Sequence, residues 1–426
     1  LGGVTKYIEI TTAEKTVTYY LGDPCGDGSS YLSRDDDEST VYRAPDDLSA
    51  RLDRSIYDMA QLPTLPALTA DEAAHLYALS KTYDLAHLAG SALLHRGLLP
   101  DGPLRAAFEK QVLLAVYRCE TQGSDLAQLD ALLTHGQIPF LPLKGSVLRQ
   151  YYPQPWMRTS CDIDVLVHPA DLDRAVALLC ENGFTIGAKS THDVALTAPA
   201  GSHIELHYDL IEDGMVNDAA AVLRRVWDTA VPHGDSTLRY DMPDDLFYFY
   251  HMAHMAKHFV STGGCGIRPL LDVWVLTHRI PFDRRSRDRL LAEGGLSAFA
   301  QQAELLSEVW FGGAAPTAVT DQMTSYILRG GLYGSMENRI TVQQQKQGGK
   351  LRYAASRIFL PYDTLKHHYP VLEQHRWLTP LMEVRRWGKL VFCGGLKRSV
   401  RELRCNSATP RQQASETQSL LSVLNL

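Results

Sequence analysis

Apolar residues recur at helical spacing through the first long periodic stretch of the chain, residues 59–137. Leu76 and Leu79 lie three positions apart, which places both on one face of a helix. Thr69, with Glu72 three residues later, has the form of a helix N-cap with a capping box. The pattern therefore predicts a small helical domain ahead of the rest of the chain.

The middle of the chain, residues 138–242, changes to short apolar runs and to alternation of apolar and polar positions, which is typical of strands. A helical segment among them begins at Pro169 and is followed by the stop signal Asn182-Gly183. The strands that we expect are residues 138–143, 162–167, 184–186, 192–196 and 203–208. This pattern predicts an α+β fold, in which a small mixed sheet with helices on one side is flanked by N-terminal and C-terminal helical regions.

From residue 243 to residue 404 the spacing of apolar residues is helical again, which predicts a C-terminal helical domain. Its clearest helical segments are residues 247–259, 269–277 and 298–310. Glycines at 263–266 and charged residues at 283–285 separate these segments. Residues 405–426 lack a strong pattern, and we expect them to form a frayed tail.

Residues 1–58 differ in composition from the rest of the chain. They contain the acidic run 35–38 and the turn-rich segment 22–30, with little periodicity. We expect this region to be disordered or to be an extension that is not native to the folded protein, with Met59 as an alternative start. The exception is residues 17–21, whose residue types suit a strand.

Composition places the chain among ordinary globular proteins, with 426 residues, 45% of them hydrophobic and 21% charged, and a net charge of −7. Seven cysteines, an odd number without paired metal-ligand spacing, favour reduced thiols over a disulfide scaffold or a zinc site. No apolar run reaches the roughly 18 residues of a membrane span, and the first residues lack the pattern of a signal peptide. From these features we expect a cytoplasmic protein.

Positive charge is concentrated toward the C-terminus. Between Lys350 and Arg404 there are twelve basic residues against four acidic ones. Such an excess favours an anionic partner, such as nucleic acid. Trp377 and Trp387 lie in the same region, so the alternative is that these helices simply form a core.

Two acids interrupt a run of apolar residues in the strand expected at 162–167. Side chains alternate faces along a strand, so Asp162 and Asp164 share one face while Ile163 lies on the other. Two carboxylates so close repel each other, and a divalent cation of the magnesium or manganese type relieves the repulsion. Glu205, in a later strand, adds a third carboxylate. The alternative is that the acids are the solvated end of a half-buried strand.

A Gly-Ser turn, a strand with two acids and an acid on a neighbouring strand form a combination that resembles the polymerase-beta-like nucleotidyltransferase superfamily. Within it, residues 68–404 are similar to a poorly characterised bacterial group of nucleotidyltransferases. The residues that carry the resemblance are Lys144, Gly145, Ser146, Arg158, Asp162, Asp164, Glu205 and His207.

The resemblance implies transfer of a nucleoside monophosphate from an NTP to a hydroxyl or similar acceptor, with release of pyrophosphate. It implies that Mg2+ or Mn2+ is held by the three catalytic carboxylates Asp162, Asp164 and Glu205, and that Glu205 also draws the proton from the acceptor. The residues implied for binding the NTP are Lys144, Gly145, Ser146 and Arg158. The sequence leaves open whether Arg158 pairs with phosphate or with the acids themselves. We expect a small molecule or sugar as acceptor, ahead of a protein side chain or RNA.

Three histidines, His251, His254 and His258, recur on one face of an expected helix. This face has three interpretations: binding of a metal such as zinc, a position in the active-site cleft, and packing against the sheet. Further candidates for the cleft are His192, His207, Arg268 and Asp272. The last two lie one helical turn apart and are expected to form a buried pair.

Two other functions compete with nucleotidyl transfer. One is a catalytically silent module with this fold that binds nucleic acid or protein through its basic region. The other is a metal hydrolase centred on the histidine-bearing helix. The presence of all three carboxylates argues against the silent module.

Overall fold

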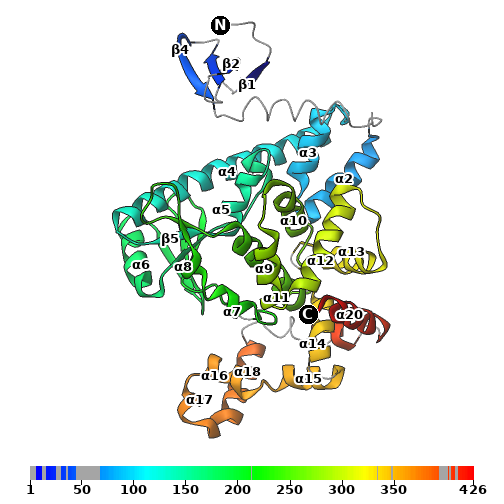
Figure 1. Cartoon of the computed structure of the whole chain (residues 1–426). Helices are drawn as coiled ribbons and strands as arrows, with labels where there is room; N and C mark the ends of the chain where they lie inside the picture. The colour runs from blue at the N-terminus through cyan, green and yellow to red at the C-terminus, as the bar shows by residue number, and fades with distance from the viewer. Residues whose placement is uncertain are drawn as a thin grey trace. The chain divides into compact units, whose positions relative to one another are not determined.

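The computed structural model contains two compact units, residues 1–67 and residues 68–426. The structure describes residues 6–11, 16–24, 30–34, 37–44, 68–212, 214–332, 334–346, 349–392, 402, 404–407 and 411–426. Figure 1 shows the course of the chain through its helices and strands.

Four antiparallel strands make up the described part of the first unit. They are β1 (Lys6–Thr11), β2 (Thr16–Pro24), β3 (Ser30–Arg34) and β4 (Asp37–Ala44), paired in that order. These strands differ from the disorder predicted for residues 1–58, and the strand considered at 17–21 lies within β2. Short segments of β-branched and aromatic residues suffice for such pairing, although the acidic and turn residues between them mask the pattern. The rest of residues 1–58 lies outside the described residues.

The second unit begins with the predicted helical region. Its helices are α2 (Ala70–Thr82), α3 (Ala86–His95) and α4 (Pro103–His135). The capping box predicted at Thr69 and Glu72 is present and starts α2. Phe108 of α4 packs on Ala73 of α2 in a small core, which fixes the helices against one another. The prediction of helices in this region is confirmed.

Five strands form the sheet of the second unit, in the order β5-β6-β9-β8-β7. Their bounds are Phe140–Pro142 for β5, Asp162–Val167 for β6, Thr185–Lys189 for β7, Asp193–Thr197 for β8 and His203–His207 for β9. Strands β6 and β9 are parallel, whereas the other neighbours are antiparallel. In this register Asp164 lies directly opposite Glu205. The α+β prediction with a small mixed sheet is confirmed.

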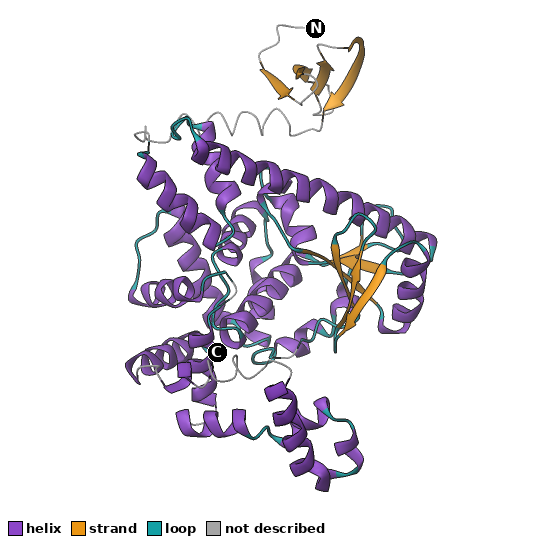
Figure 2. Ribbon diagram, turned by 180° about the vertical axis from the view of Figure 1, so that it is seen from behind, coloured by secondary structure: helices purple, strands orange, loops and turns teal. Residues whose placement is uncertain are grey.

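The two faces of β6 have different surroundings. Ile163 and Val165 are buried in a core with Leu129 of α4 and Leu179 of α6 (Leu172–Glu181). Leu166, on the other face, belongs to the core built around α9 (Asp244–Ser261). Asp162 and Asp164 share this second face, so the fold directs both acids toward α9. Figure 2 shows the small sheet among the helices of this unit.

Helices make up most of the chain after the sheet. After the short α7 (Ala219–Leu223) and α8 (Val226–Thr229) they are α9, α10 (Arg268–Arg279), α11 (Arg284–Glu293), α12 (Ser297–Ser307), α13 (Ala318–Gly330), α14 (Met336–Lys346), α15 (Lys350–Ile358), α16 (Tyr362–His368), α17 (Val371–Gln374), α18 (Thr379–Phe392) and α20 (Arg411–Leu424). The three helical segments expected in residues 243–404 correspond to α9, α10 and α12.

Two helices contradict the sequence analysis. Residues 283–285 were expected to be a charged connection, but Asp283 caps α11, whose only fully buried residue is Leu291. A helix with so little apolar surface gives almost no periodic signal. The tail expected at 405–426 contains α20, which packs on α12, α13 and α14 and buries Leu420 and Leu424.

The two tryptophans of the basic region, Trp377 and Trp387, have different surroundings. Trp377 is 77% exposed, so the core interpretation is wrong for this side chain. Trp387 donates a hydrogen bond from Nε1 to the carbonyl of Ile358.

None of the helices in the described part of the chain is both long enough and apolar enough to cross a membrane.

Candidate active site

The turn after β5 brings Lys144 and Gly145 up to the acidic strand. The backbone N–H of Leu143 donates to the carbonyl of Asp164 at 2.9 Å, which ties the turn to β6. Lys144 has a φ of 44°, in the left-handed region that is uncommon for a residue with a side chain. A Cβ at Gly145 would lie 2.8 Å from Cβ of Ser160, so this close approach requires glycine.

Asp164 is buried between two cationic side chains. Its carboxylate is 1% exposed, and Oδ1 accepts hydrogen bonds from Lys144 Nζ at 2.8 Å and from His207 Nε2 at 2.9 Å. Burial alone opposes ionisation, but the Lys144 ammonium and the His207 N–H hold the pKa of Asp164 well below its usual range. Asp164 is therefore an anion throughout the physiological pH range.

Glu205 and His207 complete the group. Glu205 Oε2 lies 3.7 Å from Lys144 Nζ and 3.4 Å from His207 Nε2, and its side chain is 27% exposed. Burial opposes a charge on His207, yet its hydrogen bonds to Asp164 and Glu205 raise the pKa of the imidazole to about 9. Its other nitrogen, Nδ1, is buried and has no hydrogen-bond partner among the described residues.

Asp162 lies two residues before Asp164 on the same face of β6, at the edge of the group. Burial and the nearby Asp164 and Glu205 carboxylates raise the pKa of Asp162 to about 6. Unlike Asp164, it has no close cationic partner among the described ion pairs. The negative charge of the group is thus least compensated at Asp162.

These residues fit a divalent cation. One ligand atom each from Asp164, Glu205 and His207 lies within 4.8 Å of the others. Two carboxylates with an imidazole suit manganese as well as magnesium, because manganese accepts nitrogen ligands more readily. The ligand set predicted from the sequence, Asp162, Asp164 and Glu205, shares two residues with this group, and the role of Asp162 as a ligand stays a prediction. The position of His207, two residues after Glu205 and thus on the same face of β9, is a signal that could have identified it.

A cavity of about 390 Å³ opens beside the acids, a volume in the range of small-molecule sites. It is lined from the sheet side by Lys144, Gly145, Asp162, Asp164 and Glu205, and from α9 and α10 by Tyr250, His251, His254, Met255, His258, Arg268 and Asp272. His192 and Arg158 also line it. Of the residues predicted for the cleft, His207 alone lies behind this lining, next to Asp164.

Both arginines singled out in the sequence, Arg158 for phosphate or the acids and Arg268 for the cleft, have protein partners. Arg158 donates from Nε to Asp272 at 2.7 Å, and the hydroxyl of Tyr152 donates to the same carboxylate oxygen at 2.6 Å. Arg268 contacts Asp84, which lies between α2 and α3, rather than Asp272. The predicted Arg268–Asp272 pair is therefore wrong, because Arg158 approaches Asp272 from the loop before β6.

Ser146 does not face the cavity. Its backbone N–H donates to the carbonyl of Leu143 at 3.2 Å, and its Oγ is buried without a hydrogen-bond partner among the described residues. The phosphate contact predicted for Ser146 has no support in this arrangement. The contact predicted for Gly145 stays a prediction, since Gly145 lines the cavity.

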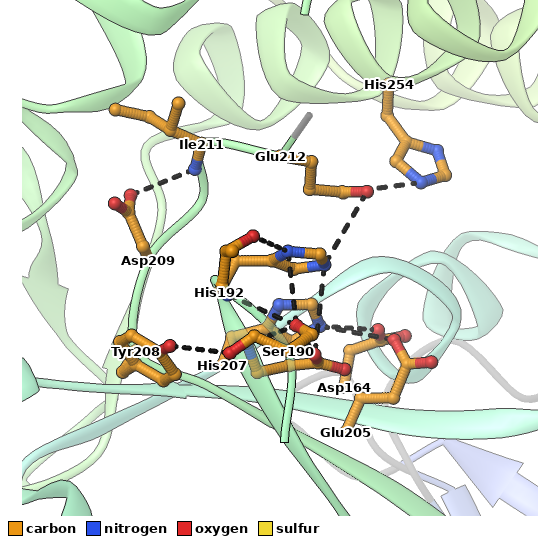
Figure 3. A network of polar contacts seen from close by, with 12 residues as sticks. Asp164, Ser190, His192, Glu205, His207, Tyr208, Asp209, Ile211, Glu212 and His254 are labelled. Carbon is orange, nitrogen blue, oxygen red and sulfur yellow. Dashed lines mark hydrogen bonds and ion pairs between the residues drawn. The ribbon is translucent and has the colours of Figure 1, made fainter. Parts of the chain in front are cut away.

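A second polar cluster lies beside the acids, and His192, whose ring stacks on His207, lies between them (Figure 3). Its centre is Glu212, which contacts Lys257 of α9 and lies 3.9 Å from His192 Nε2 and 3.8 Å from His254 Nε2. His254 and His258 are joined by a hydrogen bond of 3.2 Å between their Nε2 atoms. Sequence reasoning missed Glu212, since a single acid in a loop carries no pattern.

The histidines of α9 therefore have different surroundings. His251 Nε2 is paired with the carbonyl of Pro269 at 3.0 Å, so it packs against α10. His254 and His258 face the cavity. The cleft interpretation holds for these two histidines, and His251, which also lines the cavity, combines it with packing against α10.

The chain matches one family of known proteins. The model of a family described as uncharacterised nucleotidyltransferase matches residues 69–312, more than half of the chain. No curated protein matches the chain. A solution structure of the antibiotic-resistance factor ANT(2'')-Ia matches 45% of this chain and 98% of its own, at 8% identity and a TM-score of 0.31. A TM-score this low does not establish a shared fold.

Proposed function

Because the chain belongs to the uncharacterised nucleotidyltransferase family, we propose that it transfers a nucleoside monophosphate from an NTP to a hydroxyl-bearing acceptor and releases pyrophosphate. One observation carries this proposal. Asp164 and Glu205 lie opposite each other on parallel strands, with Asp162 on the same face, beside a cavity of about 390 Å³. Carboxylates gathered at such a cavity suit a reaction that depends on charge neutralisation and positioning.

We assign the cation ligands to Asp164, Glu205 and His207, which must lose its Nε2 proton to bind the ion, with Asp162 at the edge of the site. Bound there, Mg2+ or Mn2+ would neutralise the charge on the phosphates and favour departure of pyrophosphate. The backbone of Gly145 and the ammonium of Lys144 are the groups nearest the acids that suit phosphate oxygens. Arg158 adds positive charge to the same cavity, although Asp272 orients it.

A small molecule or a sugar is the acceptor that the cavity suits best. Its volume is in the range of small-molecule sites, and its α9 wall carries imidazole and phenol groups that suit hydroxyls. An RNA acceptor would need a basic surface around the cavity. The described basic residues between Lys350 and Arg404 do not line the cavity.

The hydrolase alternative has less support. In the described part of the chain, the group of side chains close enough to share an ion is the one at Asp164, not the histidines of α9. Nε2 of His251 is also paired with the carbonyl of Pro269. Among the described residues no third ligand lies within reach of both His254 and His258, which makes them a poor zinc site.

The test is incubation of the purified protein with each of four α-labelled NTPs and Mg2+ or Mn2+, with and without a small-molecule extract. We expect metal-dependent release of pyrophosphate and a labelled product from the extract. The matched control is Asp164→Asn, which should abolish both. Absence of pyrophosphate release from every NTP with either metal and with the extract would overturn the proposal.

A further inference from the structure

Glu212 is a buried carboxylate that the cation site does not use. It lies in the loop after β9, is 8% exposed, and lines the same cavity as Asp162, Asp164 and Glu205. Its neighbours are His254 and Lys257 of α9 and His192, which lies between Glu212 and the acids (Figure 3). Burying a carboxylate is costly unless it has a partner or a function.

The two oxygens of Glu212 have different surroundings. Oε2 contacts the Lys257 ammonium, which fixes the carboxylate in place. Oε1 lies 3.8 Å from His254 Nε2, too far for a hydrogen bond, and no described residue donates one to it. Burial opposes the charge, but Lys144 and Lys257 lower the pKa of Glu212, so it is ionised at neutral pH. Oε2 is thus held by Lys257, whereas Oε1 is free to accept a hydrogen bond from a hydroxyl group.

Glu205 is poorly suited to take a proton from the acceptor. Its Oε2 lies close to both Lys144 and His207, and these contacts place it in the cation site. A carboxylate whose lone pairs bind a cation is a weak base. Another residue that lines the cavity is therefore better suited to remove the proton from the acceptor.

We propose that Glu212 is the general base of the transfer reaction. Its Oε1 takes the proton as the acceptor O–H bond breaks. The acceptor oxygen forms a bond to the α-phosphorus of the NTP, and the bond from that phosphorus to the pyrophosphate oxygen breaks. This inference rests on the proposed nucleotidyl transfer and assigns to Glu212 a role that the sequence resemblance gave to Glu205.

Two further observations agree with this assignment. The hydroxyl of Tyr250 is buried, lines the cavity and lacks a hydrogen-bond partner among the described residues, as expected of a group that awaits a ligand. Next to Glu212, the hydrogen bond of 3.2 Å between His254 and His258 holds the His254 ring 3.8 Å from Oε1, which leaves that oxygen unoccupied. Both imidazoles are neutral near pH 7, because burial lowers their pKa, to about 4 for His258.

The experiment compares the parent protein with Glu212→Gln. Pyrophosphate release from the four NTPs is measured with Mn2+, using water and then glycerol as acceptor, and with the extract. Affinities for Mn2+ and for non-transferable α,β-methylene NTP analogues are measured on the same preparations. We expect the transfer rate to fall at least about 100-fold, as for loss of a general base, while both affinities stay within about threefold.

Two variants provide controls. Asp209→Asn removes one charge from the same loop but keeps a side chain that accepts the hydrogen bond from the Ile211 N–H, so activity should be unchanged. Glu212→Ala should lose transfer and recover part of it when formate is added, because formate supplies a carboxylate in the vacated space. A structural role for Glu212 predicts no such rescue.

The outcomes separate this inference from the proposed function. If the parent releases no pyrophosphate under any condition, nucleotidyl transfer itself is overturned, and the base with it. If the parent is active and Glu212→Gln stays within about tenfold, or loses Mn2+ affinity as well, the base assignment alone is wrong. Should Glu212→Gln fail to fold because Lys257 is left unpaired, the double variant Glu212→Gln with Lys257→Met removes both charges and is judged by the same criteria.

Discussion

The ammonium of Lys144 lies 2.8 Å from Oδ1 of Asp164, a carboxylate that is 1% exposed. The same Nζ atom is 3.7 Å from Glu205. A positive charge of the protein therefore lies between the two acids that we propose as cation ligands. Lys144 neutralises the acids in the metal-free protein, and a divalent cation would compete with it for the same oxygens.

Lys144→Gln should consequently lower the stability of the metal-free protein and increase its response to metal. The buried acids lose their counter-ion, so their repulsion is relieved only when Mn2+ binds. We expect a lower melting temperature without metal and a larger rise with saturating Mn2+ than in the parent, measured by calorimetry. An equal rise in both proteins would contradict the competition between Lys144 and the cation.

Asp164→Asn should abolish transfer and destabilise the fold. Removing this charge leaves Lys144 and His207 as cations beside a neutral amide in a buried site, at a cost of about 3–5 kcal/mol. Denaturant unfolding at pH 7 measures this cost. A stability equal to that of the parent would show that the acids repel each other more strongly than they attract their partners.

Asp162→Asn should have the opposite effect on stability. The pKa of Asp162 is raised from 3.8 to about 6 in the folded protein, so its stabilising effect is complete below pH 3.8 and is lost as the pH rises through 6. Relative to the parent, the variant should therefore gain roughly 3 kcal/mol between pH 4 and pH 6. Unfolding of both proteins across this range gives the difference, and a constant difference would contradict the raised pKa.

His207→Gln should remove a stabilisation that depends on a higher pH range. The pKa of His207 is raised from 6.5 to about 9, so its contribution is complete below pH 6.5 and is lost as the pH rises through 9. The parent should exceed the variant in stability by roughly 3 kcal/mol at pH 6, and the gap should close near pH 9. The same comparison with His192→Gln, whose ring stacks on His207 without pairing with Asp164, controls for the loss of an imidazole at this place.

The sequence alone determined the elements of the sheet and the shared face of its acids. The alternation Asp162-Ile163-Asp164-Val165 specifies a strand with one acidic and one apolar face, because side-chain direction along a strand is a local property of the backbone. The capping box at Thr69 could be predicted for the same reason. Both features depend only on residues a few positions apart.

The tertiary structure alone decided which charges meet. Arg158 rather than Arg268 pairs with Asp272, and His207 joins Asp164 because β6 and β9 are parallel and in register. Glu212 reaches the cavity only through the path of the loop after β9. These contacts join residues that are far apart in the chain, and a local pattern of residues does not predict which distant residues will meet.

The same distinction applies to the two helices that the sequence did not predict. Helix α20 is stabilised by burial of Leu420 and Leu424 against α12, α13 and α14, which no local pattern specifies. Helix α11 buries almost no apolar surface of its own, and its start depends on the cap at Asp283. Local geometry was therefore determined by sequence, whereas the partners of the charged groups and the weakly patterned helices were decided by packing between distant segments.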